Sequence, residues 1–338
     1  MRAPKSWISE YVDIPASITD SQIADALVRV GFEVEEVIVQ GADLTGPLVV
    51  GKVLAIEELK EHKKPIRYVE LDCGEGQSRF VICGAQNFAV GDLIVASLPG
   101  AVLPGGFAIS ARETYGKTSN GMICSAKELG LGDDHSGIIV LPVASAKPGD
   151  DAIELLQIND TIFDVAVNPD RGYALSIRGI AREIAAALGL NFKDPAAIEI
   201  DFKESGTPVA AKISDGAQVM YLRTLQGFNP NAASPIWMRR RIEKCGMRSI
   251  SLAVDVTNYV MMELGQPLHA FDADKIEGGL EIRRAGDSKK LKTLDGVERS
   301  LNSDDLVVAD AKSVLALAGT MGGEDSEITD STTRIAVE

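Results

Sequence analysis

The sequence predicts a multidomain α+β protein: a small β-barrel inserted in a helix-rich N-terminal module, followed by a mixed α/β domain. Three observations predict this fold class. At 338 residues the chain exceeds one usual domain, and 45% hydrophobic with 25% charged residues suits folded cores. Short apolar runs separated by turns fill the stretch from Pro47 to Pro142. Helical periodicity lies on both sides of that stretch, which favours an insertion.

The first forty residues predict helices and then a strand. Thr19 and Asp20 are capping candidates, and Gly31 ends the helical pattern that follows them. The apolar residues at helical spacing are Ile23, Leu27 and Val30. We expect a strand from Phe32 to Val39.

The central segment predicts about five short strands, a number that suits a small barrel. The predicted strands are 48–56, 66–74, 79–85, 92–99 and 107–110. A last apolar run, 137–142, closes the segment, and Gly-Pro joints separate the strands.

Helical pattern resumes after the barrel. We expect a short helix at 150–156 and a longer amphipathic helix at 174–188, which Gly189 ends. Its apolar stripe consists of Ile177, Ile180, Ala181, Ile184 and Leu188. The simplest architecture therefore inserts residues 41–151 into a module built from 1–40 and 152–195.

The remaining sequence predicts a linker at 191–199 and then mixed α/β structure. A strand is expected near 219–225, a helix near 235–245, and several hairpin-like strands after them. The last six residues, 333–338, have a strand pattern with no terminating turn, so we expect a domain over 200–338 that is truncated.

Charge and cysteine usage limit the possible functions. The net charge of -15 argues against nucleic acid, yet residues 47 to 147 hold ten Lys or Arg against eleven Asp or Glu, so this nearly neutral segment is the place to seek phosphate contacts. The four cysteines form no CxxC pair and the three histidines are scattered, so we expect buried thiols and no metal site. The sequence lacks an apolar run of about 18 residues, and we expect a cytoplasmic protein.

Two glycine-rich stretches in the barrel, 99–106 and 116–131, are candidates for RNA contact. Lys117, Ser119 and Asn120 are expected in an exposed loop, and small barrels bind oligonucleotides through such loops. Ordinary barrel turns are the alternative. A nucleotide-binding phosphate loop is excluded because Ala111 stands where its first glycine is required.

Three stretches near the C-terminus combine polar residues with glycine or proline. LAVDVTNY (252–259) is expected to place Asp255, Thr257 and Asn258 where a strand joins a helix, with helix capping as the alternative role. In GQPLHAFD (265–272), Pro267 fixes the backbone before His269.

The third stretch is AGTMGG (318–323). Gly322 and Gly323 could let backbone N–H groups approach a ligand, or could form a hairpin turn. From the sequence alone, Glu338 is only a terminal acid.

These motifs, in this order, resemble the beta subunit of bacterial phenylalanyl-tRNA synthetases. The start MRAPKSWISEYVD and the segment VGFEVEEV fit the same family, so the resemblance covers essentially the whole chain. The run 98–131 looks like the tRNA-binding barrel of such beta subunits and of free-standing tRNA chaperones. The resemblance implies an OB-type barrel at 41–151 and an incomplete editing domain at 200–338.

The family resemblance also implies roles for residues. In that family the beta subunit hydrolyses the ester bond that joins a wrongly attached tyrosine to tRNA(Phe). His269 would act on water, and the editing pocket would be formed by Thr257, Asn258, Pro267, Gly322 and Glu338. Lys117, Ser119 and Asn120 would contact tRNA(Phe). The partner would be an alpha subunit, in a heterotetramer of two alpha and two beta subunits, with ATP and Mg²⁺ bound in the parent enzyme and not in this fragment.

Two other interpretations remain open. The chain could be a non-catalytic tRNA-binding module or chaperone, and the helix at 174–188 could pack on a partner subunit rather than in the core. The basic runs 239–241 and 289–290 are expected on solvated faces rather than against tRNA.

Overall fold

The computed structural model describes residues 1–338 except 60–64, 133–134, 202 and 204. The chain forms two compact units. The first contains Met1–Lys193 and Pro235–Arg248, and the second contains Asp194–Ser234 and Ser249–Glu338. Among the described residues, no helix is long and apolar enough to cross a membrane.

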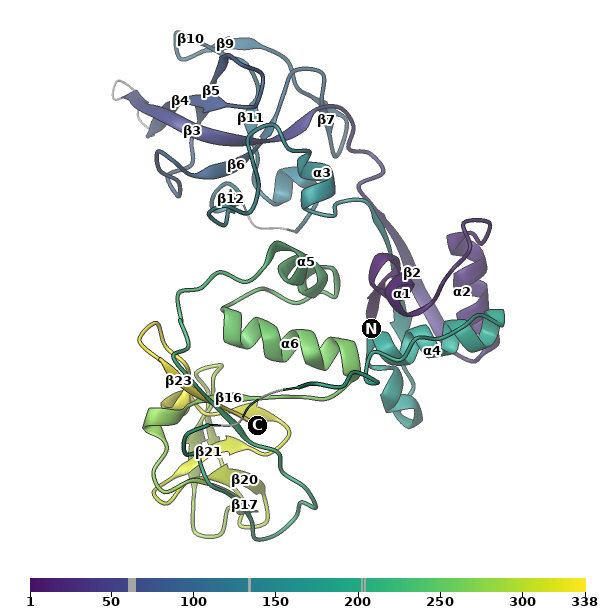
Figure 1. The fold of residues 1–338 in the computed structure, drawn as a ribbon, viewed down its shortest axis with the longest axis vertical. Coiled ribbons are helices and arrows are strands. Elements are labelled where there is room, and N and C mark those ends of the chain that lie inside the picture. Colours follow the sequence, from purple (N-terminus) through teal and green to yellow (C-terminus); the bar gives the residue numbers. More distant parts are fainter. Residues whose placement is uncertain (60–64, 133–134, 202, 204) are drawn as a thin grey trace. The chain divides into compact units, whose positions relative to one another are not determined.

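The N-terminal part of the first unit is a three-stranded antiparallel sheet with helices packed on it (Figure 1). Its strand order is β1 (Arg2–Pro4), β13 (Asp160–Ala166), β2 (Glu33–Gln40). The helices are α1 (Lys5–Tyr11), α2 (Asp20–Arg29) and α4 (Ile177–Leu188). Strands from before and after the central segment therefore pair directly with each other.

The helix predictions in this part are confirmed. Thr19 caps α2, since its hydroxyl accepts from the Gln22 amide and the Gln22 side chain accepts from the Thr19 amide. In α4 the stripe residues Ile177, Ile180, Ala181 and Ile184 are buried, so that face is core. Gly189 ends α4 with a φ of 66°, a left-handed conformation that favours glycine.

Between β2 and β13 the chain forms a curled six-stranded sheet. Its order is β11-β6-β3-β4-β5, with β12 also paired to β6. The strands are β3 (Leu48–Leu59), β4 (Ile66–Asp72), β5 (Ser78–Cys83), β6 (Leu93–Ser97), β11 (Met122–Ile123) and β12 (Val140–Leu141). The four long predicted strands are confirmed, and the expected strand at 107–110 shortens to β8 (Phe107–Ala108), paired with β7 (Val102–Leu103).

Cores lie on both sides of this sheet. One cluster contains Val53, Val69, Val81 and Ile94, and the other contains Val50, Val95, Leu141 and Leu156. The second is covered by α3 (Ala152–Leu155) and by the turn η1 (Lys127–Leu129). All four cysteines are buried and free, as predicted.

Helix α5 (Ile236–Lys244) belongs to the first unit and corrects one prediction. The Arg240 side chain is buried and donates from Nε to the Leu156 carbonyl at 2.9 Å. Arg241 lies over the rings of Trp7 and Trp237. The expected solvated face is therefore wrong for Arg240 and Arg241, whereas it holds for Lys290, whose side chain is 64% exposed.

In the described residues of the second unit, two larger sheets combine with the helix α6 (Leu252–Leu264). The sheets are β14-β17-β20-β21-β22 and β15-β23-β16. Their strands are β14 (Ala211–Ile213), β17 (Leu280–Arg284), β20 (Leu306–Ala309), β21 (Val314–Leu317), β22 (Met321–Gly322), β15 (Arg223–Gln226), β23 (Arg334–Val337) and β16 (Ala270–Asp272). A separate hairpin pairs β18 (Lys290–Lys292) with β19 (Glu298–Ser300).

One expectation for this unit is wrong, and another is confirmed only in part. The stretch 252–259 is not a strand-to-helix join, because α6 (Leu252–Leu264) is helical throughout. The strand expected near 219–225 begins only at Arg223, and the apolar side chains before it are exposed at Val219 and Tyr221. The core of the unit instead gathers around Phe271, Val308 and Ala336.

Candidate functional site

His269 and Glu338 are hydrogen-bonded neighbours, although they lie far apart in sequence. The His269 amide donates to the Glu338 carbonyl at 3.0 Å, and the Glu338 amide donates to the His269 carbonyl at 2.8 Å. The pairing of β16 with β23 creates this contact, since Ala270 faces Val337 in the antiparallel register.

Gly322 lies directly against the His269 ring. A Cβ built on Gly322 would come within 2.4 Å of Cε1 and 2.6 Å of Nε2 of that imidazole. The ring also meets Phe271 edge to face, with centroids 4.4 Å apart. Only a residue without a side chain fits at this contact, which accounts for the glycine.

Burial shifts the pKa of both titratable side chains of this cluster, His269 and Glu338. It lowers the pKa of His269 and raises the pKa of Glu338. Nε2 of His269 is buried and has no hydrogen-bond partner among the described residues. The imidazole is therefore neutral at neutral pH and can accept a hydrogen bond or a proton from a bound molecule.

The other three residues predicted for this pocket lie on α6 or in the loop before β16. Thr257 is buried on α6, where its hydroxyl donates to the Val254 carbonyl at 2.8 Å, and Asn258 is half-buried on the same helix. Pro267 is exposed in the loop before β16. The hydrogen bonds of the described residues join none of these three to His269.

Asp255 has a structural role. Its carboxylate is buried and accepts from the Ser234 hydroxyl at 2.5 Å, the Ser249 hydroxyl at 2.6 Å and the Ile250 amide at 2.8 Å. These bonds join the segments before α6 to the helix, but Asp255 is not its N-cap, since that position belongs to Ser251.

In the first unit, the predicted RNA-contact residues do not form an exposed loop. Lys117 and Ser119 belong to β10 (Lys117–Ser119), which forms a hairpin with β9 (Arg112–Thr114). The Ser119 hydroxyl is buried, accepting from the Ile82 amide at 3.0 Å and donating to the Gly121 carbonyl at 3.1 Å. Asn120 is half-buried, and its backbone N–H donates to the Phe80 carbonyl at 2.8 Å.

Two aromatic residues missed by the sequence analysis lie beside this hairpin. Tyr68 on β4 and Phe80 on β5 stack with ring centroids 5.3 Å apart. Lys117 Nζ lies 4.9 Å from the Tyr68 ring centroid and 3.0 Å from a Glu57 carboxylate oxygen. The Phe80 side chain remains 37% exposed, so one apolar ring faces solvent next to a cation. The sequence contains one signal for this pair. Each aromatic residue directly precedes a valine, Val69 or Val81, that is buried on the opposite face of its strand.

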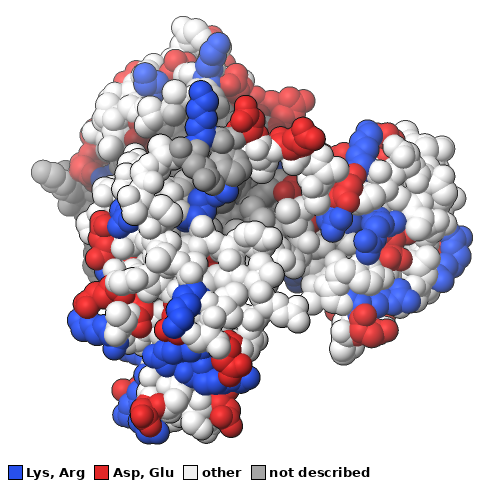
Figure 2. All heavy atoms as spheres, turned by 60° about the horizontal axis from the view of Figure 1, so that its bottom comes forward, with Lys and Arg blue, Asp and Glu red and all other residues white. Residues whose placement is uncertain are grey.

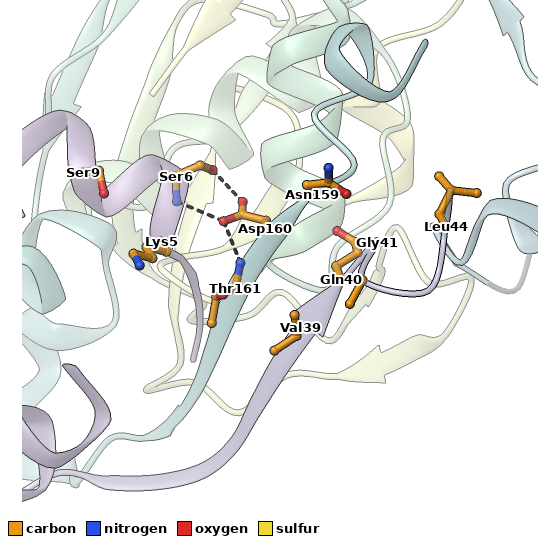
Figure 3. Close-up of a pocket in the computed structure, with 11 residues that line it drawn as sticks. Lys5, Ser6, Ser9, Val39, Gln40, Gly41, Leu44, Asn159, Asp160 and Thr161 are labelled. Atoms are coloured by element: carbon orange, nitrogen blue, oxygen red, sulfur yellow. Dashed lines mark hydrogen bonds between the residues drawn. The ribbon is translucent and has the colours of Figure 1, made fainter. Parts of the chain in front are cut away.

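A large open cavity of about 620 Å³ lies where β2 and β13 meet α1 (Figure 3). Its charged groups already have partners. Lys5 pairs with Asp20 at 2.5 Å, and Asp160 accepts from the Ser6 hydroxyl at 2.5 Å and from Lys244 at 2.7 Å. The cavity therefore offers uncharged groups to a ligand, both polar ones such as Asn159 and apolar ones such as Val39 and Leu44.

Comparison with protein families assigns most of both units. Residues 48–151 match the family described as a putative tRNA binding domain. Residues 216–338 match the family described as the B3/4 domain. The first range contains the curled sheet with Tyr68 and Phe80, and the second contains the cluster of His269, Gly322 and Glu338.

Whole-chain comparison finds close relatives. The chain is 54% identical to the phenylalanine–tRNA ligase beta subunit of Thermobifida fusca over 345 residues, covering 100% of this chain and 41% of the relative. It is also 54% identical to the beta subunit of Streptomyces avermitilis, covering 100% of this chain and 42% of that relative. The chain thus spans about two fifths of the length of these curated relatives.

A solved structure is similar at a much lower level. An N-terminal fragment of the phenylalanyl-tRNA synthetase beta subunit of Pyrococcus horikoshii is 14% identical, with a TM-score of 0.32. It covers 53% of this chain and 55% of that one. A score of this size does not establish a shared fold.

Proposed function

We propose that this chain, which belongs to the family of phenylalanine–tRNA ligase beta subunits, binds tRNA and contributes to removing tyrosine from mischarged Tyr-tRNA(Phe). One observation carries the editing proposal. His269, Gly322 and Glu338, drawn from three separated stretches, meet in one partly buried cluster that includes an unpartnered imidazole nitrogen.

The need for such a site follows from binding physics. A pocket built for phenylalanine rejects an added hydroxyl by only about a hundredfold, so a second site that seeks the hydroxyl is required. The Glu338 carboxyl, which burial already disfavours as an anion, would be the hydrogen-bond partner of the tyrosine phenol. Bound phenylalanine would leave that carboxyl unpaired, at a cost of about 1 to 3 kcal/mol.

His269 would act on the water that attacks the ester. An imidazole kept neutral by burial can accept a proton from water, and its orphaned Nε2 supplies the acceptor. The Gly322 backbone, Thr257 and Asn258 would hold the ester and the terminal ribose, with Pro267 stiffening the loop before His269. A covalent nucleophile is unnecessary because an aminoacyl ester is already labile.

For tRNA binding we propose that residues 41–151 form an OB-type barrel inserted between 1–40 and 152–195, with 200–338 as the editing domain. The curled sheet and the direct pairing of β2 with β13 support the insertion. The hydrogen bond from the Asn120 amide to the Phe80 carbonyl supports barrel closure. Tyr68, Phe80 and Lys117 would provide the RNA-binding face, with Asn120 beside them and the buried Ser119 holding the hairpin in place.

The remaining proposals concern the whole enzyme. It would act in the cytoplasm as a heterotetramer of two alpha and two beta subunits, with ATP and Mg²⁺ bound outside this chain. Among the described residues, no group of three or more His, Cys, Asp or Glu side chains is arranged to hold a metal ion. The stretch around Lys117 also lacks the spacing of a phosphate loop.

The test is hydrolysis of Tyr-tRNA(Phe) by the full-length enzyme carrying His269→Ala. We expect the deacylation rate to fall about a hundredfold or more, as for loss of a general base, while phenylalanine attachment continues. His135→Ala, which changes a histidine of the other unit, is the matched control. Unchanged deacylation in His269→Ala would contradict the role proposed for His269 in activating the water.

A further inference from the structure

A small apolar cavity in the first unit is unrelated to the proposed editing and RNA-binding residues. It lies between the last part of the inserted segment and helix α5, with a volume of about 70 Å³. Its apolar walls are Ala126, Leu131, Ile139, Val140, Leu141, Pro142, Leu156 and Ile236. Its charged lining residues all come from α5: Arg239, Arg240 and Glu243.

Arg240 is the unusual member of this lining. The residue is 4% exposed, and its guanidinium is only partly satisfied. Nε donates to the Leu156 carbonyl at 2.9 Å and Nη1 pairs with the Glu243 carboxylate. Nη2 is buried and has no hydrogen-bond partner among the residues that the structure describes. A buried donor left unpaired costs about 1 to 3 kcal/mol, more when it is charged, so the Arg240 guanidinium favours a further acceptor.

The charges of the lining specify the kind of acceptor. Arg239 and Arg240 contribute two positive charges and Glu243 one negative charge, which leaves one positive charge to be balanced. A carboxylate accepts charge-assisted hydrogen bonds from a guanidinium, which are about twice as strong as neutral ones. A water molecule fits less well, because the other walls are aliphatic and a buried water needs two to four polar partners.

The volume and the walls limit the rest of the ligand. Since one water requires about 10 to 15 Å³ on this measure, the cavity accommodates about half a dozen non-hydrogen atoms. We propose that this cavity is a binding site for a small aliphatic monocarboxylate, with its carboxylate toward the Arg240 guanidinium and its tail against Leu131, Ile139 and Ile236.

The test uses isovalerate as the probe, on the full-length beta subunit assembled with its partner. Isovaleramide and isoamyl alcohol keep the tail and remove the charge. Titration calorimetry at constant ionic strength should show isovalerate binding at least about tenfold more tightly than either analogue. Arg240→Met, which keeps a long buried side chain, should abolish the preference for the acid. Arg239→Met should weaken binding by a smaller factor, since Arg239 already has more solvent access.

A second variant keeps the guanidinium in place. Leu131→Trp fills the cavity from its wall, so isovalerate binding should be lost although Arg240 is unchanged. Three results would overturn the proposal: no isovalerate binding by the unmodified enzyme, equal binding of acid and alcohol, or full binding by Leu131→Trp. None of them concerns Tyr-tRNA(Phe) hydrolysis, so this proposal and the editing proposal fail independently.

Discussion

Gly322 and His269 are packed so closely that a single methyl group at position 322 would displace the imidazole. The built Cβ of Gly322 lies 2.4 Å from Cε1, well below any normal contact. Gly322→Ala should destabilise the fold by about 1 to 3 kcal/mol through overpacking and should slow Tyr-tRNA(Phe) hydrolysis. Urea unfolding and the deacylation assay measure the two effects. Gly84→Ala is the control, because its added methyl would meet open space; equal effects of both variants would contradict the proposed contact.

Burial shifts His269 and Glu338 in opposite directions, and both shifts link stability to pH. The folded-state pKa of His269 lies below its ordinary value of 6.5, so its contribution is present above pH 6.5 and is lost as the pH falls below it. The folded-state pKa of Glu338 lies above its ordinary value of 4.5, so its contribution declines as the pH rises above 4.5. Between these values the two effects oppose each other.

Variants separate these two titrations. In Glu338→Gln only the His269 titration remains. The urea concentration at the unfolding midpoint should therefore decrease as the pH is lowered from about 7 to about 5. In His269→Phe only the Glu338 titration remains. Relative to the unmodified protein, the urea concentration at the unfolding midpoint should increase as the pH is lowered from about 7 to about 5. If the unfolding midpoints of both variants changed with pH in the same direction, the opposite pKa shifts of His269 and Glu338 would be contradicted.

Helix α5 is held to the first unit by a buried ion pair. Lys244 Nζ and Asp160 Oδ2 are 2.7 Å apart, with side chains 1% and 3% exposed. Removing one partner of such a pair leaves the other charged and desolvated, so Lys244→Met should cost about 3 to 5 kcal/mol in urea unfolding. Lys290→Met, in an ion pair 64% and 61% exposed, is the matched control and should leave the midpoint almost unchanged. A small effect at Lys244 would mean that the Ser6 and Thr161 hydrogen bonds alone satisfy Asp160.

The elements that sequence predicts well are those whose local signals agree. α2 has both a capping box and helical spacing, and α4 has a full apolar stripe ended by Gly189, so both were predictable. α6 was misread because the run Leu252–Val254 is short and apolar, a pattern common to buried strands and helices. The basic run at 239–241 was misread because tertiary acceptors such as the Leu156 carbonyl are invisible in local sequence.

The candidate site depends on the whole fold of the second unit rather than on any one stretch. From the sequence, the family resemblance supplied His269, Gly322 and Glu338 as pocket residues, and the pairing of β16 with β23 brings His269 and Glu338 together. Register between distant strands is set by packing against the core residues Phe271 and Ala336, which local patterns do not specify. The Tyr68 and Phe80 pair was missed for the same reason: stacking requires the β4 and β5 register.

The charge of the whole molecule bears on how it would bind RNA. The net charge is -15, and basic and acidic side chains are interspersed on the face drawn in Figure 2. Long-range attraction of a polyanion is therefore weak, and local contacts must supply the affinity. The Tyr68 and Phe80 rings beside Lys117 combine a stacking surface with one cation, which suits unpaired bases.

Stacking and phosphate contact differ in their dependence on salt, so two variants of the full-length enzyme can separate them. Phe80→Ala should weaken tRNA binding by about 1 to 3 kcal/mol and leave the slope of log affinity against log salt unchanged, because no counterion is released by a stacked ring. Lys117→Met should reduce that slope by about one unit, the amount for one phosphate contact. Val143→Ala, which trims an apolar side chain that is 95% exposed, should change neither affinity nor slope. An exposed ring that does not stack on a base contributes nothing to affinity. If Phe80→Ala binds tRNA as tightly as the unmodified enzyme, tRNA therefore binds another face of the inserted segment.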